Sequence, residues 1–328
     1  MRHPNGRGRS TVIAGIDEAG YGPLLGPLVM AASAYRLQPG ASEAALNSLL
    51  TDDLQQARGL PTADSKLLYK GRSSIERIEI STYGHSVLAR GRLPSTVAEL
   101  LDLAIDTPSS ELAELPWYGQ RFSETSLPRR ADVEAITERA TQHRNWLAER
   151  GTEFAELILA PVLVPRFNRI TSAAGSKAVT LFATTCRLIE TLIERFPDDE
   201  LIIHIDRQGG RVHYGGVMQA NFPMAPVDVL HEARPQSSYQ LHWPERPPVH
   251  IDFSVKADGN YAPVATASVA AKTLRELSME SFCRWFGERQ TNLAPTAGYG
   301  TDGRRFLNEV TERLQAESIP LNHVERCR

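Results

Sequence analysis

Acidic residues stand at or just beyond the ends of three strand-like segments of the chain. They are Asp17 and Glu18 after residues 11–16, Asp206 at the end of 201–206, and Asp258 just beyond 249–256. A single carboxylate in such a place is usually a turn or cap residue. In an open α/β sheet, however, ligand sites lie at the carboxyl ends of the strands. Three such positions in one chain therefore predict a shared site.

The chemistry of clustered carboxylates points to hard cations. Carboxylates held together repel one another and acquire raised pKa values unless cations neutralise them. Oxygen ligands suit Mg²⁺ or Mn²⁺, and two such ions about 4 Å apart hold the attacking and leaving oxygens of a phosphodiester displacement. Adjacent Asp17 and Glu18 would point to opposite faces of a regular strand. We therefore expect the strand to break at Ala19-Gly20.

The glycines after this acidic pair also invite comparison with a dinucleotide-binding loop. Gly20, Gly22 and Gly26 have the spacing G-x-G-x-x-x-G, whereas that loop has G-x-G-x-x-G. Two acidic residues also precede the glycines, where a pyrophosphate would be repelled. We therefore favour the carboxylate site.

Short apolar runs and one long helix are predicted to position these carboxylates. Residues 11–16 and 28–35 have the composition of strands, and 201–206 and 249–256 have the length and apolar character of buried strands. Residues 176–195 read as a helix with Ser176 as N-cap and Pro197 beyond its end. This order predicts an α/β fold with a mixed β-sheet flanked by helices.

Residues 84–160 differ in character from the rest of the chain. Helical stretches near 95–105 and 131–150 flank a Pro-, Ser- and Trp-bearing loop around 108–128. We interpret 84–160 as a helical insertion or subdomain within a catalytic domain that spans 1–328. Trp117 and Tyr118 in this loop suit either base stacking or a small core.

Composition restricts the class of protein. The 36 Lys and Arg residues against 39 Asp and Glu residues give a net charge of −3, so a nucleic-acid partner requires a local basic patch. The three cysteines lack C-x-x-C spacing and the histidines lack His-x-x-x-His spacing, which argues against disulfides and zinc. No apolar stretch approaches the roughly 20 residues of a membrane span. We expect a soluble, cytoplasmic monomer that does not bind membranes.

Several segments resemble one known family. Residues 15–27, Gly-Ile-Asp-Glu-Ala-Gly-Tyr-Gly-Pro-Leu-Leu-Gly-Pro, closely resemble the opening signature of ribonuclease HII. Further similar segments follow in the family's order: 64–66, 167–168 before a long helix, 205–206, 256–258 with 263–276, and 298–301. No single segment is specific, but the ordered set is, and it spans most of the chain outside 84–160.

The resemblance implies an RNase H-like fold and a metal-dependent endonuclease. The substrate would be RNA in RNA/DNA hybrids or ribonucleotides embedded in duplex DNA, and the products would carry a 5′-phosphate and a 3′-hydroxyl. It also implies that the catalytic residues, which are the ligands of two Mg²⁺ or Mn²⁺ ions, are Asp17, Glu18, Asp206 and Asp258.

The resemblance further implies a set of substrate contacts. Ser268 and Lys272 are four residues apart on a predicted helix, so they share a face, and they resemble the family's phosphate-contacting pair. Lys66 resembles another phosphate contact. Tyr299 resembles a tyrosine that packs against the sugar at the cleavage junction, and the amides of Gly20-Tyr21-Gly22 resemble those that address the 2′-hydroxyl.

Two positions depart from the family pattern. Tyr21 stands where the family has arginine, which removes a charge near the scissile phosphate, and Leu67 stands where it has a second lysine. Two alternatives therefore stay open: a nucleic-acid-binding protein that keeps the fold without hydrolysis, and a two-metal nuclease with another substrate. A pure binding protein gains nothing from clustered carboxylates beside a phosphate backbone, which favours an enzyme.

Overall fold

A seven-stranded mixed sheet organises the chain in the computed structural model, which describes residues 9–71, 74–106 and 109–327. The strand order is β3-β2-β1-β4-β7-β6-β5. β1 is antiparallel to β2 and parallel to β4, and β4 is parallel to β7. The strands are β1 Thr11–Ala19, β2 Leu28–Leu37, β3 Thr152–Val162, β4 Glu200–Asp206, β5 Val227–Glu232, β6 Gln236–Leu241 and β7 Val249–Ser254. The predicted strands thus correspond to β1, β2, β4 and β7.

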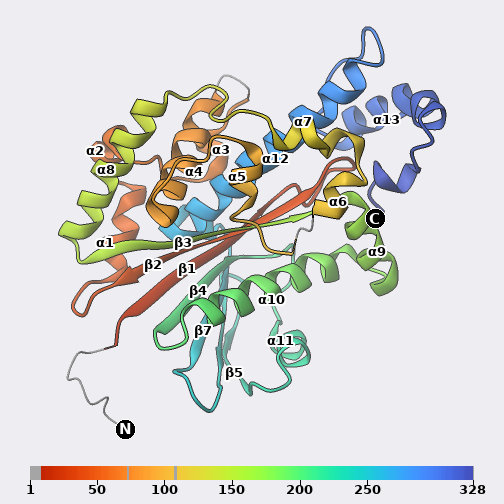
Figure 1. Ribbon diagram of the computed structural model, residues 1–328. Coiled ribbons are helices and arrows are strands. Elements are labelled where there is room, and N and C mark those ends of the chain that lie inside the picture. The colour runs from red at the N-terminus through yellow and green to blue at the C-terminus, as the bar shows by residue number, and fades with distance from the viewer. Residues whose placement is uncertain (1–8, 72–73, 107–108, 328) are drawn as a thin grey trace.

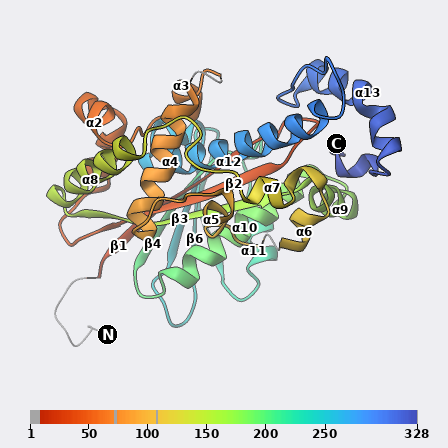
Figure 2. The same ribbon diagram turned by 45° about the horizontal axis from the view of Figure 1, so that its top comes forward.

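Helices cover both faces of this sheet (Figures 1 and 2). Helices α4, α8 and α12 pack on one face, and α10 packs on the other. The α-helices are α1 Glu43–Asn47, α2 Asp53–Arg58, α3 Ser65–Leu68, α4 Ile75–Arg90, α5 Val97–Leu101, α6 Ser109–Ala113, α7 Gln120–Ser123, α8 Val133–Glu149, α9 Val164–Ala174, α10 Lys177–Arg195, α11 Gly215–Asn221, α12 Ala262–Gly287 and α13 Gly300–Ala316. Short 3₁₀ turns are η1 Ser48–Leu50, η3 Pro116–Tyr118, η4 Ala257–Gly259 and η5 Leu321–His323.

The strands bury side chains on both faces, which explains their nearly continuous apolar sequences. In β1, Ile13 belongs to the hydrophobic cluster under α12, whereas Val12 and Ala14 belong to the cluster under α10. This alternation follows from the two-residue period of a strand. Gly15 allows the closest approach between β1 and α12, because a Cβ at this position would lie 2.2 Å from the backbone nitrogen of Val264.

Helix α10 confirms the predicted helix and its cap. The helix begins at Lys177, and the Ser176 hydroxyl accepts a hydrogen bond from the backbone N–H of Ala178. Its C-cap is Phe196, immediately before Pro197. No helix within the described ranges combines the length and apolar character that a membrane span requires.

The interval 84–160 differs locally from the prediction. Helix α5 is shorter than the stretch 95–105, because residues 103–105 hydrogen-bond to Leu159 of β3 instead of continuing the helix. An edge strand leaves backbone groups that need such partners. The predicted loop contains α6, η3 and α7, although Pro108 lies outside the described residues.

The same interval is joined to the main core. Residues 152–160 belong to β3, and Leu100, Trp117 and Leu147 lie in the hydrophobic cluster that includes Ile13 of β1. The exposed fractions of Trp117 and Tyr118 are only 3% and 2%, so these side chains are core and are not open to base stacking. The division into a catalytic domain and an insertion stays a prediction.

Candidate active site

The carboxyl ends of β1, β4 and β7 lie next to one another and carry the acidic residues. The parallel pairing of β1 with β4 ends one residue before Asp17 and Asp206. β4 and β7 pair up to Asp206 and Ser254, and Asp258 follows in η4. The carboxylate of Asp206 accepts a hydrogen bond of 2.9 Å from the backbone N–H of Ala257, which ties the end of β4 to η4.

The end of β1 explains how two adjacent carboxylates approach the same neighbours. β1 ends at Ala19 as expected, and Gly20 has a φ of +87°, a left-handed conformation that favours glycine. Its pairing with β4 stops three residues earlier, whereas its pairing with β2 continues to Ala19. Asp17 and Glu18 therefore have no strand beside them on the β4 side, and both interact electrostatically with Asp206.

Burial and mutual repulsion raise the pKa values of the clustered carboxylates. Burial is the largest cause for each of them. The pKa of Asp17 lies well above its ordinary value, with Glu18 and Asp206 as further causes. The pKa of Glu18 rises to about 7 and that of Asp258 to about 6, and the pKa of Asp206 is also raised. The protein alone therefore leaves this negative charge poorly compensated.

This cluster fits hard cations in its chemistry but is not a preassembled ligand cage. Across residues 9–71, 74–106 and 109–327, no three His, Cys, Asp or Glu side chains form a ready-made metal-binding group. All four predicted ligands nevertheless offer carboxylate oxygens, which suit Mg²⁺ or Mn²⁺. A divalent cation would also offset the repulsion that raises their pKa values.

Lys66 reaches the cluster from α3, and Asp64 accompanies it. The Lys66 charge lowers the pKa of Glu18, Asp206 and Asp258. The Asp64 side chain caps α3 by accepting a hydrogen bond from the backbone N–H of Lys66, and its charge raises the pKa of Asp258 and Asp206. The sequence reasoning used Asp64 only as part of a motif and missed its place in the cluster. The sequence feature that could have indicated this place is that Asp64 is an N-cap residue two positions before Lys66.

The two predicted phosphate contacts on α12 occupy different environments. Ser268 is only 3% exposed, its hydroxyl is hydrogen-bonded to the Ser65 hydroxyl at 3.0 Å, and its hydrogen bond to Asp17 lowers the pKa of that carboxyl group. The Lys272 ammonium lies 2.7 Å from a carboxylate oxygen of Glu276 and 4.5 Å from the centre of the Tyr69 ring. Ser268 thus borders the carboxylates directly, whereas Lys272 lies one turn farther along α12 in an ion pair.

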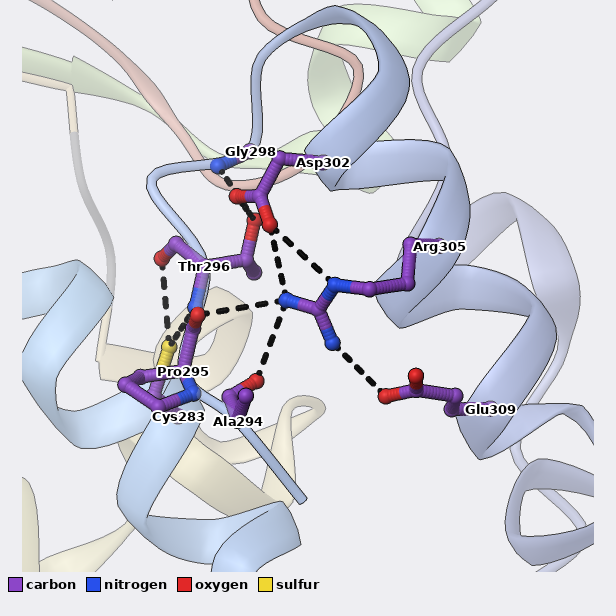
Figure 3. Close-up of polar contacts among 8 residues, drawn as sticks. All are labelled: Cys283, Ala294, Pro295, Thr296, Gly298, Asp302, Arg305 and Glu309. Carbon is purple, nitrogen blue, oxygen red and sulfur yellow. Dashed lines mark hydrogen bonds and ion pairs between the residues drawn. The ribbon is translucent and has the colours of Figure 1, made fainter.

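A polar network around Thr296, Gly298 and Asp302 (Figure 3) holds the turn in which Tyr299 lies. The Thr296 hydroxyl donates to Asp302 at 2.6 Å and accepts from the Gly298 N–H at 2.9 Å. Arg305 donates to Asp302 and to the carbonyl oxygens of Ala294 and Pro295. The Tyr299 side chain stays 47% exposed.

The same turn is attached to the glycine-rich loop. The Gly298 carbonyl accepts a hydrogen bond of 2.7 Å from the Leu24 N–H, and a Cβ at Gly22 would lie 3.9 Å from the Tyr299 ring. The guanidinium of Arg275 lies 5.3 Å from the centre of that ring. The structure thus places Gly22 and Tyr299, which are far apart in sequence, side by side.

Tyr21 has cationic neighbours. The Lys177 ammonium lies 4.8 Å from the centre of the Tyr21 ring. Burial and the Glu18 charge raise the pKa of Tyr21, and the Arg211 charge lowers it. Two cations, Lys177 and Arg211, therefore act on the position where the ribonuclease HII signature has arginine.

His204 is a buried strand residue outside the carboxylate cluster. Its ring stacks on Tyr261 at 3.8 Å between centres and lies 2.9 Å from Glu43 and 3.3 Å from Asp252. Burial disfavours the charged ring, but both carboxylates favour it more strongly, so the pKa of His204 is raised. Its role is in packing and charge pairing within the sheet.

Comparison with family models and curated protein sequences tests the resemblance to ribonuclease HII. Residues 214–324, about a third of the chain, match the family model "Ribonuclease HII". No curated protein sequence matches significantly. The matched segment contains Asp258, Ser268, Lys272 and Tyr299.

Similar solved structures come from ribonucleases H. One is a chain of the PCNA:RNase HII complex from Archaeoglobus fulgidus, with 16% identity over 97% of this chain and 94% of that chain and a TM-score of 0.43. Bst-RNase HIII in complex with Mn²⁺ has 13% identity over 96% and 66%, with a TM-score of 0.43. Ribonuclease H2 from Pyrococcus horikoshii has 13% identity over 96% and 92%, with a TM-score of 0.38. At such TM-scores these likenesses carry no argument about the site. The family-model match, which covers residues 214–324, instead supports the resemblance that the motifs indicate: this part of the chain is similar to ribonuclease HII.

Proposed function

We propose that the chain is a divalent-metal-dependent endonuclease that cuts RNA in RNA/DNA hybrids or at ribonucleotides embedded in duplex DNA. It leaves a 5′-phosphate and a 3′-hydroxyl, and it works in the cytoplasm as a monomer. The observation that carries this proposal is the approach of Asp17, Glu18, Asp206 and Asp258 at the carboxyl ends of β1 and β4 and in η4, with raised pKa values.

Each carboxylate has a distinct place in the proposed site. Asp17 is buried beside Ser268, whose hydrogen bond favours its ionised form. The Asp206 carboxylate is oriented by the hydrogen bond that it accepts from the Ala257 N–H. Glu18 and Asp258 complete a set of carboxylates that would hold two Mg²⁺ or Mn²⁺ ions. Such ions, when bound, supply an activated water and charge stabilisation for the departing oxygen.

The remaining residues bind and orient the nucleic acid. The hydrolysis forms a bond from water oxygen to phosphorus and breaks the bond from phosphorus to the 3′-oxygen, which takes up a proton. Lys66, beside the carboxylates, supplies positive charge for the phosphate. Gly22 and Tyr299 lie side by side, so a ribose bound against both would meet backbone amides and an exposed ring. This arrangement supports recognition of a ribonucleotide.

Cleavage of end-labelled duplexes tests the proposal. Purified protein is incubated with Mg²⁺, Mn²⁺ or EDTA and three duplexes of one sequence: all-DNA, DNA with a single ribonucleotide, and an RNA/DNA hybrid. We expect cleavage only with a metal ion and only of duplexes that contain ribonucleotides. Binding without cleavage would support the non-hydrolytic alternative. Equal cleavage of all-DNA duplex would support a two-metal nuclease with another substrate.

A further inference from the structure

Two cations converge on Tyr21 from segments that are distant in sequence. Lys177 is the first residue of α10, and its ammonium lies 4.8 Å from the centre of the Tyr21 ring. Arg211 lies in the loop between β4 and α11, and its charge lowers the pKa of Tyr21 and of Tyr214. Tyr21 is half-buried, so part of its ring remains exposed beside the Lys177 ammonium.

Neither cation is used in an ion pair. Among the described residues, no carboxylate lies within ion-pair distance of Lys177 or Arg211, whereas Lys272 on α12 is paired with Glu276. The guanidinium of Arg211 lies 5.4 Å from the centre of the Phe182 ring and 5.6 Å from that of Tyr214. These contacts hold the planar group in place without consuming its N–H donors. Both side chains are half-buried and remain accessible.

The tyrosines that Lys177 and Arg211 contact, Tyr21 and Tyr214, lie near the carboxylate cluster. The charge of Glu18 raises the pKa of Tyr21. The charge of Asp206 raises the pKa of Tyr214, and that of Arg211 lowers it. Lys66 reaches the same carboxylates from α3, which packs with α12 on the opposite face of the sheet from α10 (Figures 1 and 2). Cations from both faces of the sheet therefore border the acidic cluster. The dipole of the 19-residue helix α10 adds positive potential at Lys177.

We propose that Lys177, over the Tyr21 ring, and Arg211, over the Tyr214 ring, form a phosphate-binding site for the nucleic-acid backbone beside the carboxylate cluster. This inference rests on the proposed function for the identity of its ligand. The site restores, from α10 and the loop after β4, the positive charge that Tyr21 removes from the glycine-rich loop. Two cations that lie over aromatic rings and have no ion-pair partner among the described residues match a phosphodiester, because it is an anion with several acceptor oxygens.

Salt-dependent binding tests this site without requiring hydrolysis. The affinities of wild type, Lys177→Gln, Arg211→Gln and the double variant are measured by fluorescence anisotropy on a single-ribonucleotide duplex, in an Asp206→Asn background. Each lost charge should reduce the slope of log K against log salt by about 0.9, which is roughly eightfold weaker binding at 0.1 M salt. Lys177→Arg with Arg211→Lys should retain the slope. Adding Tyr21→Arg to the double variant should restore about one unit.

A charge at the other end of α10 provides the control. Arg195 lies 18 residues from Lys177, roughly 27 Å along the helix, and pairs with Glu156. Arg195→Gln removes the same charge and should leave the slope within 0.3 of wild type, a margin of about a third of one contact.

The outcomes separate this site from the proposed function. A reduced slope in the variants supports the phosphate site even if wild type cleaves nothing, a result that would sink only the nuclease proposal. An unchanged slope while wild type cleaves ribonucleotide duplexes would overturn the phosphate site alone. A lower melting temperature with an unchanged slope would also overturn it, because the cations would then only balance the carboxylates. No binding of any duplex by wild type would overturn both.

Discussion

Asp206→Asn should raise the thermal stability of the metal-free protein while abolishing cleavage. The amide keeps the shape of the carboxylate and an oxygen that can accept the Ala257 N–H. It removes a negative charge that contributes to the raised pKa of Asp17, Glu18 and Asp258. It also removes a proposed metal ligand, so we expect the cleavage rate to fall by about 10³-fold, equivalent to roughly 4 kcal/mol of transition-state stabilisation.

The pKa of Glu18 sets the size of the stability gain. Its rise from 4.5 to about 7 corresponds to roughly 3 kcal/mol. Burial is the largest cause and the Asp206 charge is the next, so removal of that charge should recover about 1 kcal/mol after allowance for screening. For a chain of this length, 1 kcal/mol is roughly 2 °C in melting temperature.

The pH dependence of this gain has a defined sign. A carboxyl group with a raised pKa binds more protons in the folded state than in the unfolded state, so its ionisation destabilises the fold as the pH rises. For Glu18 this window runs from 4.5 to about 7. The advantage of Asp206→Asn should therefore be full above pH 7 and vanish near pH 4.5.

Thermal melts in EDTA at pH 8, 6 and 4.5 measure this advantage. Asp198→Asn, which removes an exposed carboxylate elsewhere, controls for net charge. Addition of Mn²⁺ should stabilise wild type more than the Asp206 variant, because a ligand stabilises only the state that binds it. An equal or lower melting temperature for Asp206→Asn at pH 8 in EDTA would refute the repulsion argument. Wild-type turnover by the variant would remove Asp206 from the catalytic set.

Three further substitutions test other parts of the structure. Lys272→Ala should weaken duplex binding regardless of sequence and flatten the salt slope by about one unit; an unchanged slope in anisotropy titrations would leave Lys272 with its pairing to Glu276 alone. Tyr299→Ala should lower kcat/KM at a ribonucleotide junction by about tenfold, as loss of a stacking contact of roughly 1–3 kcal/mol predicts, while Tyr299→Phe should retain most of the rate. Burial opposes ionisation of Asp252, but hydrogen bonds, the largest of them from His204, hold the pKa of Asp252 below its ordinary value of 3.8. The stability that ionised Asp252 gives to the fold is therefore present above pH 3.8 and is lost as the pH falls further. Asp252→Asn should thus cost roughly 3 kcal/mol in urea unfolding at pH 7, and a cost that does not shrink below pH 3.8 would contradict this.

Local sequence predicted the elements that carry the site. β1 and β4 were predictable because their apolar runs end at carboxylates, and α10 was predictable from its N-cap Ser176 and from Pro197. These signals act over a few residues, through side-chain period and capping. The predicted helix 95–105 was correct only for Val97–Leu101, and the reason is not local. Its last residues bond to Leu159 of β3, a partner that local propensity does not reveal.

The sequence by itself thus determined which residues are available for chemistry: carboxylates at strand ends, a glycine-rich turn after β1, and motifs in the family's order. Only the tertiary structure decided which of them meet. It set β1 beside β4, added Asp64 to the cluster, buried Trp117 in the core, and brought Lys177 to Tyr21. The physical reason is that sheet order and helix packing are fixed by burial between segments far apart in the chain, whereas a sequence pattern reports only the turn, strand or helix in which a residue lies.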